Sequence, residues 1–220
     1  DDNQIRAKVI DATFPREMSM GEGIRKIRQA AVDAINDGYE LLIFSDRKVD
    51  EEHMPVPSLL LTGGIHHHLI RKGLRSHAGI ILETGDPTDV HHYCTLIGYG
   101  ADAINPYLAY ASVENLIDND VLQMEKAEAL QNYKHAVEDG LLKVMSKMGI
   151  STLESYKGAQ IFEIIGLNRY VISEFFEGTV SRIEGIGLKE LEEDARWRHQ
   201  YAYNRRVAGT PELDQEGEYY

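Results

Sequence analysis

The chain has 220 residues, of which 43% are hydrophobic, and a formal net charge of -13 at pH 7. The hydrophobic content is enough for a packed core and argues against a disordered chain, and the length suits one domain with extensions. The acidic balance argues against nucleic-acid binding, which needs clustered Lys and Arg, and no apolar run approaches the ~20 residues of a membrane-spanning helix.

The first half of the chain alternates short apolar runs with segments of helical periodicity. We expect strands at residues 8–14, 41–44, 78–83 and 103–105. We expect helices from the Ser19–Glu22 capping box to Asn36, and at residues 58–72, 88–99 and 107–117. Strands that alternate with helices of this length are typical of βαβ units, so we predict an α/β fold with a parallel sheet and flanking helices.

The second half of the chain has a different pattern. A long helical stretch covers residues 120–148, with a break expected near Asn132, and a short strand is expected at residues 149–152. Further helices are expected at residues 155–165, ended by Gly166, and at 188–199, whereas residues 171–177 fit either state. We therefore divide the chain into an α/β core (1–118), a mostly helical C-terminal region (119–203) and a polar, aperiodic linker (204–220).

Cys94 is the only cysteine, so an internal disulfide is excluded and a reducing, cytoplasmic location is expected. Its apolar neighbours Tyr93 and Leu96 predict a buried structural thiol rather than a reactive one. One thiol cannot hold an iron–sulfur cluster, which needs three or four. The chain also lacks the glycine-rich phosphate-binding patterns and the nucleophile-elbow pattern of hydrolases.

Two groups of consecutive histidines suggest a metal site, with Glu83 and Asp86 as further ligands. The groups are His66–His68 and His91–His92. Consecutive residues on a helix point ~100° apart, so they converge poorly on one ion, and the helical His-Glu-x-x-His spacing is absent. The alternative is that these histidines bind loop carbonyls or contact another domain or a ligand, and we assign no metal ligand.

Polar side chains follow several of the expected strands. Asp11 and Thr13 end the first strand, Asp46 follows the second, and Asn105 ends the fourth, with Glu83-Thr84 after the third. In a parallel sheet these positions share one edge, where α/β proteins place their sites, so they are expected to converge on one crevice. The alternative is that loops after strands are polar in any case.

Several segments of the chain are long and unusual in composition. The run from Ser58 to Arg75 places three histidines after Gly63-Gly64, and Glu83-Thr-Gly85, Val90-His-His92 and Ile97–Ala101 follow it. Residues 12–15 and 38–47 precede this run, and residues 103–107, 140–152, 156–167 and 181–188 follow it. In this order the segments resemble the central domain of the large subunit of glutamate synthase, over nearly the whole chain.

The resemblance implies a parent enzyme that makes two glutamates from glutamine and 2-oxoglutarate. In that family an amidotransferase domain releases ammonia, and a tunnel carries the ammonia to a barrel domain in which FMN reduces 2-iminoglutarate. An iron–sulfur cluster relays electrons from NAD(P)H through a small subunit, or from ferredoxin. The resemblance further implies that the central domain bridges the amidotransferase and FMN domains and helps to form the ammonia tunnel.

The chain departs from the complete enzyme, since it starts with Asp1 rather than a nucleophilic cysteine and cannot hold the cluster. We therefore expect an excised piece that is not catalytic by itself and binds neither cofactor nor metal. Its exposed apolar patches are expected to favour self-association. The candidates for the tunnel wall or for contacts with neighbouring domains are Asp11, Thr13, Asp46, His66 and Asn105.

The resemblance also implies a partial TIM-barrel-like sheet, because the five or six expected strands are too few for a closed eight-stranded barrel. Two other functions remain open. One is a standalone His-rich metal-dependent hydrolase, and the other is a small-ligand-binding regulatory module.

Overall fold

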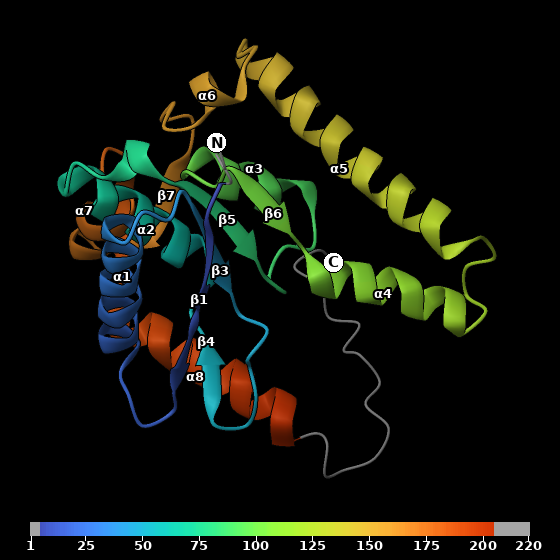
Figure 1. Cartoon of the computed structure of the whole chain (residues 1–220), viewed down its shortest axis with the longest axis horizontal. Helices are drawn as coiled ribbons and strands as arrows, with labels where there is room; N and C mark the ends of the chain where they lie inside the picture. The colour runs from blue at the N-terminus through green and yellow to red at the C-terminus, as the bar shows by residue number, and fades with distance from the viewer. Residues whose placement is uncertain (1–4, 205–220) are drawn as a thin grey trace.

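The computed structural model describes residues 5–204 (Figure 1). Its main sheet consists of β1 (Ala7–Asp11), β3 (Leu41–Ser45), β5 (Gly79–Glu83) and β6 (Ala103–Asn105). The connecting helices are α1 (Met20–Asn36), α2 (Ser58–Arg71) and α3 (Val90–Gly98), with a short 3₁₀ helix η1 (Arg75–His77) before β5. A small antiparallel pair, β2 (Thr13–Pro15) and β4 (His53–Pro55), follows the main sheet at its carboxyl edge.

Helices dominate the rest of the described chain. These elements are α4 (Tyr107–Asp118), α5 (Lys126–Met148), α6 (Leu153–Tyr156), β7 (Glu163–Leu167), α7 (Arg169–Phe175), β8 (Val180–Ile186) and α8 (Leu188–Asn204). Helices α4 and α5 extend to one side of the sheet in Figure 1, and α8 lies below it. None of the helices within residues 5–204 combines the length and the apolar character needed to cross a lipid bilayer.

The four strands of the main sheet lie in chain order and are all parallel. Their register aligns Val9, Ile43, Ile81 and Ala103 across the sheet. Right-handed crossovers between neighbours in chain order put every connecting helix on the same face of the sheet. The opposite face therefore has no helix from these crossovers, and Val9 on that face is 61% exposed.

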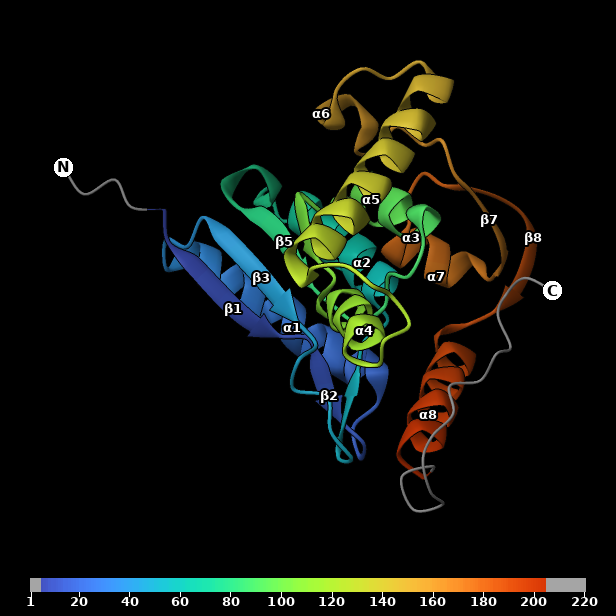
Figure 2. The same cartoon turned by 90° about the vertical axis from the view of Figure 1, so that its right-hand side faces the viewer.

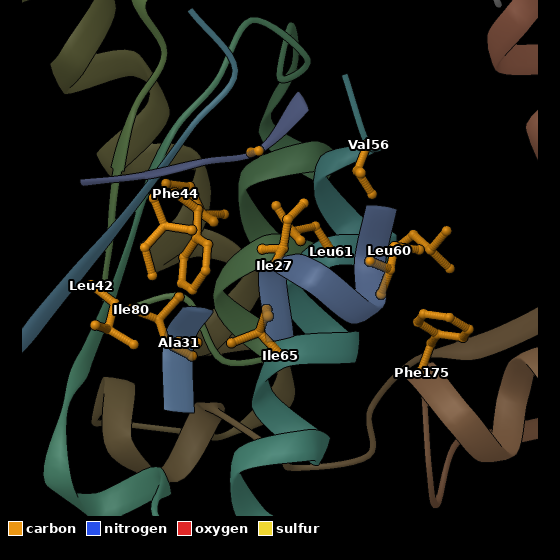
Figure 3. Packing of buried hydrophobic residues seen from close by; sticks show 14 of the residues in the cluster. Ile27, Ala31, Leu42, Phe44, Val56, Leu60, Leu61, Ile65, Ile80 and Phe175 are labelled. Carbon is orange, nitrogen blue, oxygen red and sulfur yellow. The ribbon is translucent and has the colours of Figure 1, made fainter. Parts of the chain in front are cut away.

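The core lies between the sheet and its crossover helices. Leu42, Phe44 and Ile80 point from the sheet toward α1 and α2, where Ile27 and Ile65 face them (Figure 3). All five side chains are buried. The alternation of buried and half-exposed residues along β3 and β5 is typical of a sheet that is covered on one face.

Helix α1 illustrates how the sequence sets its own boundaries. The Ser19 hydroxyl accepts a hydrogen bond from the Glu22 backbone N–H, and Glu22 in turn accepts from the Ser19 backbone N–H. This capping box starts the helix, and Asn36-Asp37-Gly38 ends it, because Gly38 takes a left-handed conformation with φ 81°. The apolar positions at helical spacing are the ones that the structure buries, among them Ile24, Ile27 and Ala31.

Helix α7 packs closely against α2 at the two adjacent glycines. A Cβ on Gly63 would lie 2.3 Å from the Phe175 carbonyl oxygen, and one on Gly64 would lie 2.8 Å from the Phe175 ring. Arg28 on α1 fixes the same contact, since its Nε donates to the Gly64 carbonyl at 3.1 Å and its guanidinium pairs with Glu174. The glycines in the histidine-rich run therefore have a packing role.

Helix α8 holds the C-terminal part of the chain against the beginning of α1. Arg196 donates hydrogen bonds to the carbonyl oxygens of Arg16 and Met18 at 2.6 and 2.7 Å. Glu192 accepts from the Met20 backbone N–H at 2.8 Å and also pairs with Arg196. These contacts join segments that are more than 170 residues apart in the sequence.

The α/β class and the parallel sheet with flanking helices are confirmed. A TIM-barrel-like fold is not, because the four parallel strands of the main sheet do not close into a barrel. The expected strand at residues 8–14 divides into β1 and β2, since the Asp11 side chain accepts from the Thr13 backbone N–H at 3.0 Å and forms a turn there.

Three expectations for the second half are wrong. The helix expected at residues 155–165 is replaced by the single turn α6 and by β7, because Gly158 and Gln160 take positive φ values of 71° and 54°. The strand expected at 149–152 is instead the cap of α5, where Gly149 is left-handed. Helix α5 also begins later than expected and continues through Asn132 without a break. The linker assigned to residues 204–220 lies outside the described residues apart from Asn204, which ends α8.

We expect Gly63→Ala to lower the free energy of unfolding by about 2 kcal/mol, because the added methyl group overlaps the α7 backbone. The matched control is Gly21→Ala in α1, whose Cβ would meet only Leu188 Cδ2 at 3.4 Å and Arg25. This control should leave stability unchanged or raise it by up to about 1 kcal/mol. Urea denaturation of both variants measures the difference, and equal stabilities would contradict the close α2–α7 contact.

Candidate functional site

One row of polar residues crosses the carboxyl edge of the main sheet. Asp11 on β1, Ser45 on β3, Glu83 on β5 and Asn105 on β6 occupy the same register position on four neighbouring strands. The parallel, in-order arrangement thus brings together residues that are up to 94 positions apart in the sequence. This is the edge at which open α/β sheets bind their ligands.

Glu83 is the centre of the hydrogen bonds in this row. Its carboxylate accepts from Ser45 Oγ at 2.6 Å, from Arg47 Nε at 2.7 Å and from Asn105 Nδ2 at 3.3 Å. The hydrogen bond from Ser45 is the main reason that the pKa of Glu83 lies below its ordinary value, and Arg47 adds to this effect against the opposing effect of burial. The network joins the carboxyl ends of β3, β5 and β6.

Asp46 is the most buried carboxylate at this edge, with 6% of its surface exposed. Its Oδ2 accepts from Thr84 Oγ1 at 2.6 Å and from the Gly85 backbone N–H at 3.1 Å. Its Oδ1 is buried and has no hydrogen bond of normal geometry among residues 5–204, but the Tyr107 hydroxyl is close enough to stabilise the charged carboxylate. Burial raises the pKa of Asp46 above its ordinary value, although the hydrogen bond from Thr84 works in the opposite direction. The carboxyl edge therefore holds one desolvated carboxylate between Thr84, Gly85 and Tyr107.

Arg47 and Tyr107 stand beside this carboxylate. The Arg47 guanidinium lies 4.3 Å from the centre of the Tyr107 ring while it donates to Glu83. Burial raises the pKa of Tyr107, and the neighbouring Asp46 carboxylate raises it further. Both residues were absent from the candidates named from the sequence, although Arg47 directly follows Asp46 and Tyr107 opens α4.

Asp11 and Thr13 form a separate part of the same edge. Asp11 Oδ1 accepts from both the backbone N–H and the hydroxyl of Thr13, at 3.0 and 2.7 Å, and Lys48 lies 3.2 Å from Oδ2. Burial favours a higher pKa for Asp11, but the hydrogen bonds from Thr13 outweigh it and the pKa lies below its ordinary value. Four of the five candidates from the sequence therefore lie at the carboxyl edge.

A cavity of about 590 Å³ opens next to this edge, between the start of α2, the loop after β5, and α8. Asp86, in the loop after β5, lies against the start of α2, where its carboxylate accepts a hydrogen bond from the Ser58 backbone N–H at 2.7 Å. From α8, His199 lines the cavity and bonds through Nε2 to the Asp50 carbonyl at 2.7 Å. The sequence does not predict this cavity, because one of its walls comes from α8, in a distant part of the chain.

His66 lies at the opposite, amino edge of the sheet. Its Nδ1 accepts from Arg75 Nε at 3.0 Å, and Arg75 also bonds to the Gly100 carbonyl and to Asp102, both at 2.9 Å. Burial, reinforced by the charge of Arg75, lowers the pKa of His66 to about 4. The structure thus does not bring His66 together with the other four candidates.

The metal hypothesis has no support in the described residues. Within residues 5–204, no group of three or more His, Cys, Asp or Glu side chains is placed to hold a metal ion. His66–His68 share α2, and burial lowers the pKa of all three. Cys94 is buried, and burial raises its pKa, so this thiol does not suit a metal cluster.

Comparisons with known proteins identify relatives of this chain. The family model of the glutamate synthase central domain matches residues 1–168. The large chain of the NADPH glutamate synthase of Bacillus subtilis (strain 168) is 46% identical over 208 residues, which cover 94% of this chain. The NADH glutamate synthase of Saccharomyces cerevisiae is 42% identical over 96% of this chain. The ferredoxin-dependent glutamate synthase of Pyropia yezoensis is 44% identical over 82% of it. The chain spans only 14%, 10% and 12% of the length of these three relatives.

We expect Glu83→Gln to lower the free energy of unfolding by about 1 kcal/mol at pH 7, because the amide loses its charge-assisted bonds to Ser45 and Arg47. Since the folded-state pKa of Glu83 lies below the ordinary 4.5, this stabilisation is full above pH 4.5 and is lost as the pH falls through the lowered pKa. Denaturation of both proteins between pH 7 and pH 3 should show the difference shrink below pH 4.5.

The control for this measurement is Glu51→Gln, an exposed carboxyl whose side chain accepts no hydrogen bond from residues 5–204. It should have no comparable effect. A difference between wild type and Glu83→Gln that persists unchanged at acidic pH would contradict the ionic role of Glu83.

Proposed function

This chain belongs to the glutamate synthase central domain family, and we propose that it works as the connecting domain of such an enzyme. In this role it bridges an amidotransferase domain and an FMN-binding domain, and it helps to form the path of ammonia between them. The enzyme as a whole converts glutamine and 2-oxoglutarate into two glutamates. The observation that carries the proposal is the family match over residues 1–168.

The carboxyl edge suits a path for ammonia. Ammonia needs a few hydrogen-bonding groups in surroundings that are poor in water, and the polar row of this edge lies beside the apolar residues Val9, Ile43 and Ile81 on the uncovered face. The buried Asp46 carboxylate, with the Tyr107 hydroxyl beside it, offers an acceptor at this edge. We therefore assign Asp46 and Asn105 to the wall of the path.

Asp11 and Thr13 complete the proposed wall on the side of β1. The two hydrogen bonds that Thr13 donates to Asp11 hold the turn at the end of this strand. His66 lies at the other edge of the sheet, and we assign it to contacts with a neighbouring domain. The hydrogen bond from Arg75 Nε fixes its ring there, and its low pKa keeps it uncharged at neutral pH.

The sheet itself is proposed to be a partial barrel. In a TIM barrel, consecutive parallel strands are neighbours and all helices lie outside. The order β1-β3-β5-β6 with helices on one face has the same topology over four strands. The uncovered face with Val9 then corresponds to the inner side of such a barrel.

The cofactors of the parent enzyme, FMN and an iron–sulfur cluster, are proposed to lie in its other domains. The donor set of this chain does not fit the cluster, because Cys94 is single and buried. Electrons would reach the parent through a small subunit or from ferredoxin, without contact with this chain. We place the enzyme in the cytoplasm, in keeping with a chain that cannot form an internal disulfide.

A bulky side chain at the carboxyl edge should uncouple the parent enzyme. In a large chain that contains this segment, we expect Asn105→Trp to narrow the path, so that more ammonia escapes to the solvent per glutamate formed. The measurement is the ratio of ammonia released to glutamate produced at saturating glutamine.

The matched control is His77→Trp, which adds the same side chain at an exposed position before β5, at the amino edge. It should leave the ratio unchanged. If both variants keep the ratio of the unmodified enzyme while Asn105→Trp remains folded, the carboxyl edge is not the path.

The purified chain by itself should show no glutaminase activity, no bound yellow flavin and no formation of glutamate. Absorbance spectra and assays with glutamine and 2-oxoglutarate test this. Flavin absorbance at a stoichiometric level would contradict the proposal that the cofactor site lies in another domain.

A further inference from the structure

Strand β8 has an outer edge without a partner. It pairs with β7 on one side, in a two-stranded parallel sheet, and within residues 5–204 no strand lies on its other side. Figure 2 shows β8 at the periphery of the molecule. Residues 182–186 are all exposed. Two strands are too few for an independently stable sheet, and an open edge is a template for another strand.

The surface of this two-stranded sheet is unusually apolar. Ile165 on β7 is 69% exposed and Ile183 opposite it on β8 is 59% exposed, and Val180 and Ile186 at the two ends of β8 are exposed as well. Parallel strands are normally buried on both faces. The exposed β-branched residues therefore indicate that further strands or another chain covers this region.

The sequence of β8 is complementary to its own reverse. The strand reads Val-Ser-Arg-Ile-Glu-Gly-Ile. If a second copy pairs antiparallel about Ile183, Arg182 of each copy stands opposite Glu184 of the other. Val180 of each copy likewise stands opposite Ile186 of the other. Opposite charges and β-branched residues in such cross-strand positions stabilise antiparallel pairs.

We propose that β8 is the dimerisation edge of this chain, and that its partner is a second copy. The two β8 strands pair antiparallel around a twofold axis through Ile183 and form a continuous sheet in the order β7-β8-β8-β7. The interface is isologous, so each favourable contact occurs twice. This inference concerns a different surface from the proposed ammonia path.

The negative net charge of the chain favours self-association at a surface that carries no excess negative charge. A chain with a net charge of -13 repels its own copy over most of its surface. The two-stranded sheet is locally neutral, because Arg169 pairs with Glu184 at 2.6 Å and Arg182 lies 3.6 Å from Glu163. Two copies can therefore approach here without like-charge repulsion.

The charges of Arg182 and Glu184 also disfavour the pairing of β8 with unrelated strands. An edge that presents Arg182 and Glu184 is unfavourable for a strand without the matching charges. The β1 edge of the main sheet lacks this symmetry, since reversal of β1 about Val9 would place Lys8 opposite Ile10 and Ala7 opposite Asp11. Of these two edges, β8 is the self-complementary one.

Charge reversal tests the proposal. Sedimentation velocity of the purified chain over a wide concentration range should show a monomer–dimer equilibrium. Glu184→Arg and Arg182→Glu should each raise the dimer dissociation constant by about tenfold or more, because each places like charges opposite each other twice. The double variant Arg182→Glu/Glu184→Arg restores opposite charges between the copies. It should bind more tightly than either single variant but less tightly than the unmodified chain, because it also places like charges beside Glu163 and Arg169.

Two features make the test specific. Glu184→Arg makes the chain less acidic and Arg182→Glu makes it more acidic, so a general effect of net charge would change the dimer in opposite directions. Lys8→Glu makes the same charge change on the edge strand β1 and should leave the equilibrium unaltered. The side chains of Arg182 and Glu184 are 77% and 52% exposed, and circular dichroism checks that each variant folds.

A chain that sediments as a monomer at every concentration would overturn the proposal. So would a dimer that neither single reversal weakens, or a double variant that binds more weakly than both single variants.

Discussion

The constraint on which this structure depends is the in-order arrangement of four parallel strands. Because each crossover is right-handed, the order β1-β3-β5-β6 places the connecting helices on one face and leaves the other uncovered. The same order aligns Asp11, Ser45, Glu83 and Asn105 across one edge. The buried core, the uncovered face and the polar edge are thus three consequences of one topology.

The two edges of the sheet differ in the partners that surround their aspartate side chains. At the amino edge, Asp102 is surrounded by Arg75, Lys157 and the Ile80 backbone N–H, so its charge is fully compensated and holds α6 to the sheet. At the carboxyl edge, Asp46 is desolvated and is bonded to Thr84 and Gly85, with the Tyr107 hydroxyl beside it and no cation of residues 5–204 in contact. Tyr156, next to Lys157, has a buried hydroxyl without a hydrogen bond of normal geometry in residues 5–204, so a missing partner does not distinguish the two edges. The carboxyl edge is distinguished by its row of polar side chains on four strands.

Local patterns in the sequence predicted much of the first half of the fold. The Ser19–Glu22 capping box located the start of α1, and the apolar runs located β3 and β5. The strand-end residues Asp11, Thr13, Asp46 and Asn105 came together because a parallel sheet gathers its carboxyl ends. The position of each of these features depends on neighbours within a few residues or on one general rule of topology.

The remaining features depend on contacts that the sequence does not display. His66 was grouped with the strand ends, but eight residues of helix carry it ~12 Å from the start of α2, toward the opposite edge. A short apolar run such as residues 161–165 fits either a helix or a strand, and its pairing with β8 decides the outcome. The cavity beside α8 joins Ser58 to His199, and no local pattern links two segments so far apart.

The most direct measurement is an experimental structure of a glutamate synthase large chain that contains this segment, with its other domains in place. We predict a continuous passage between the amidotransferase and FMN sites that runs along the carboxyl edge of this sheet, with Asp46 and Asn105 on its wall. A passage that bypasses this edge, or solid packing of another domain over Asp46, would contradict the central claim.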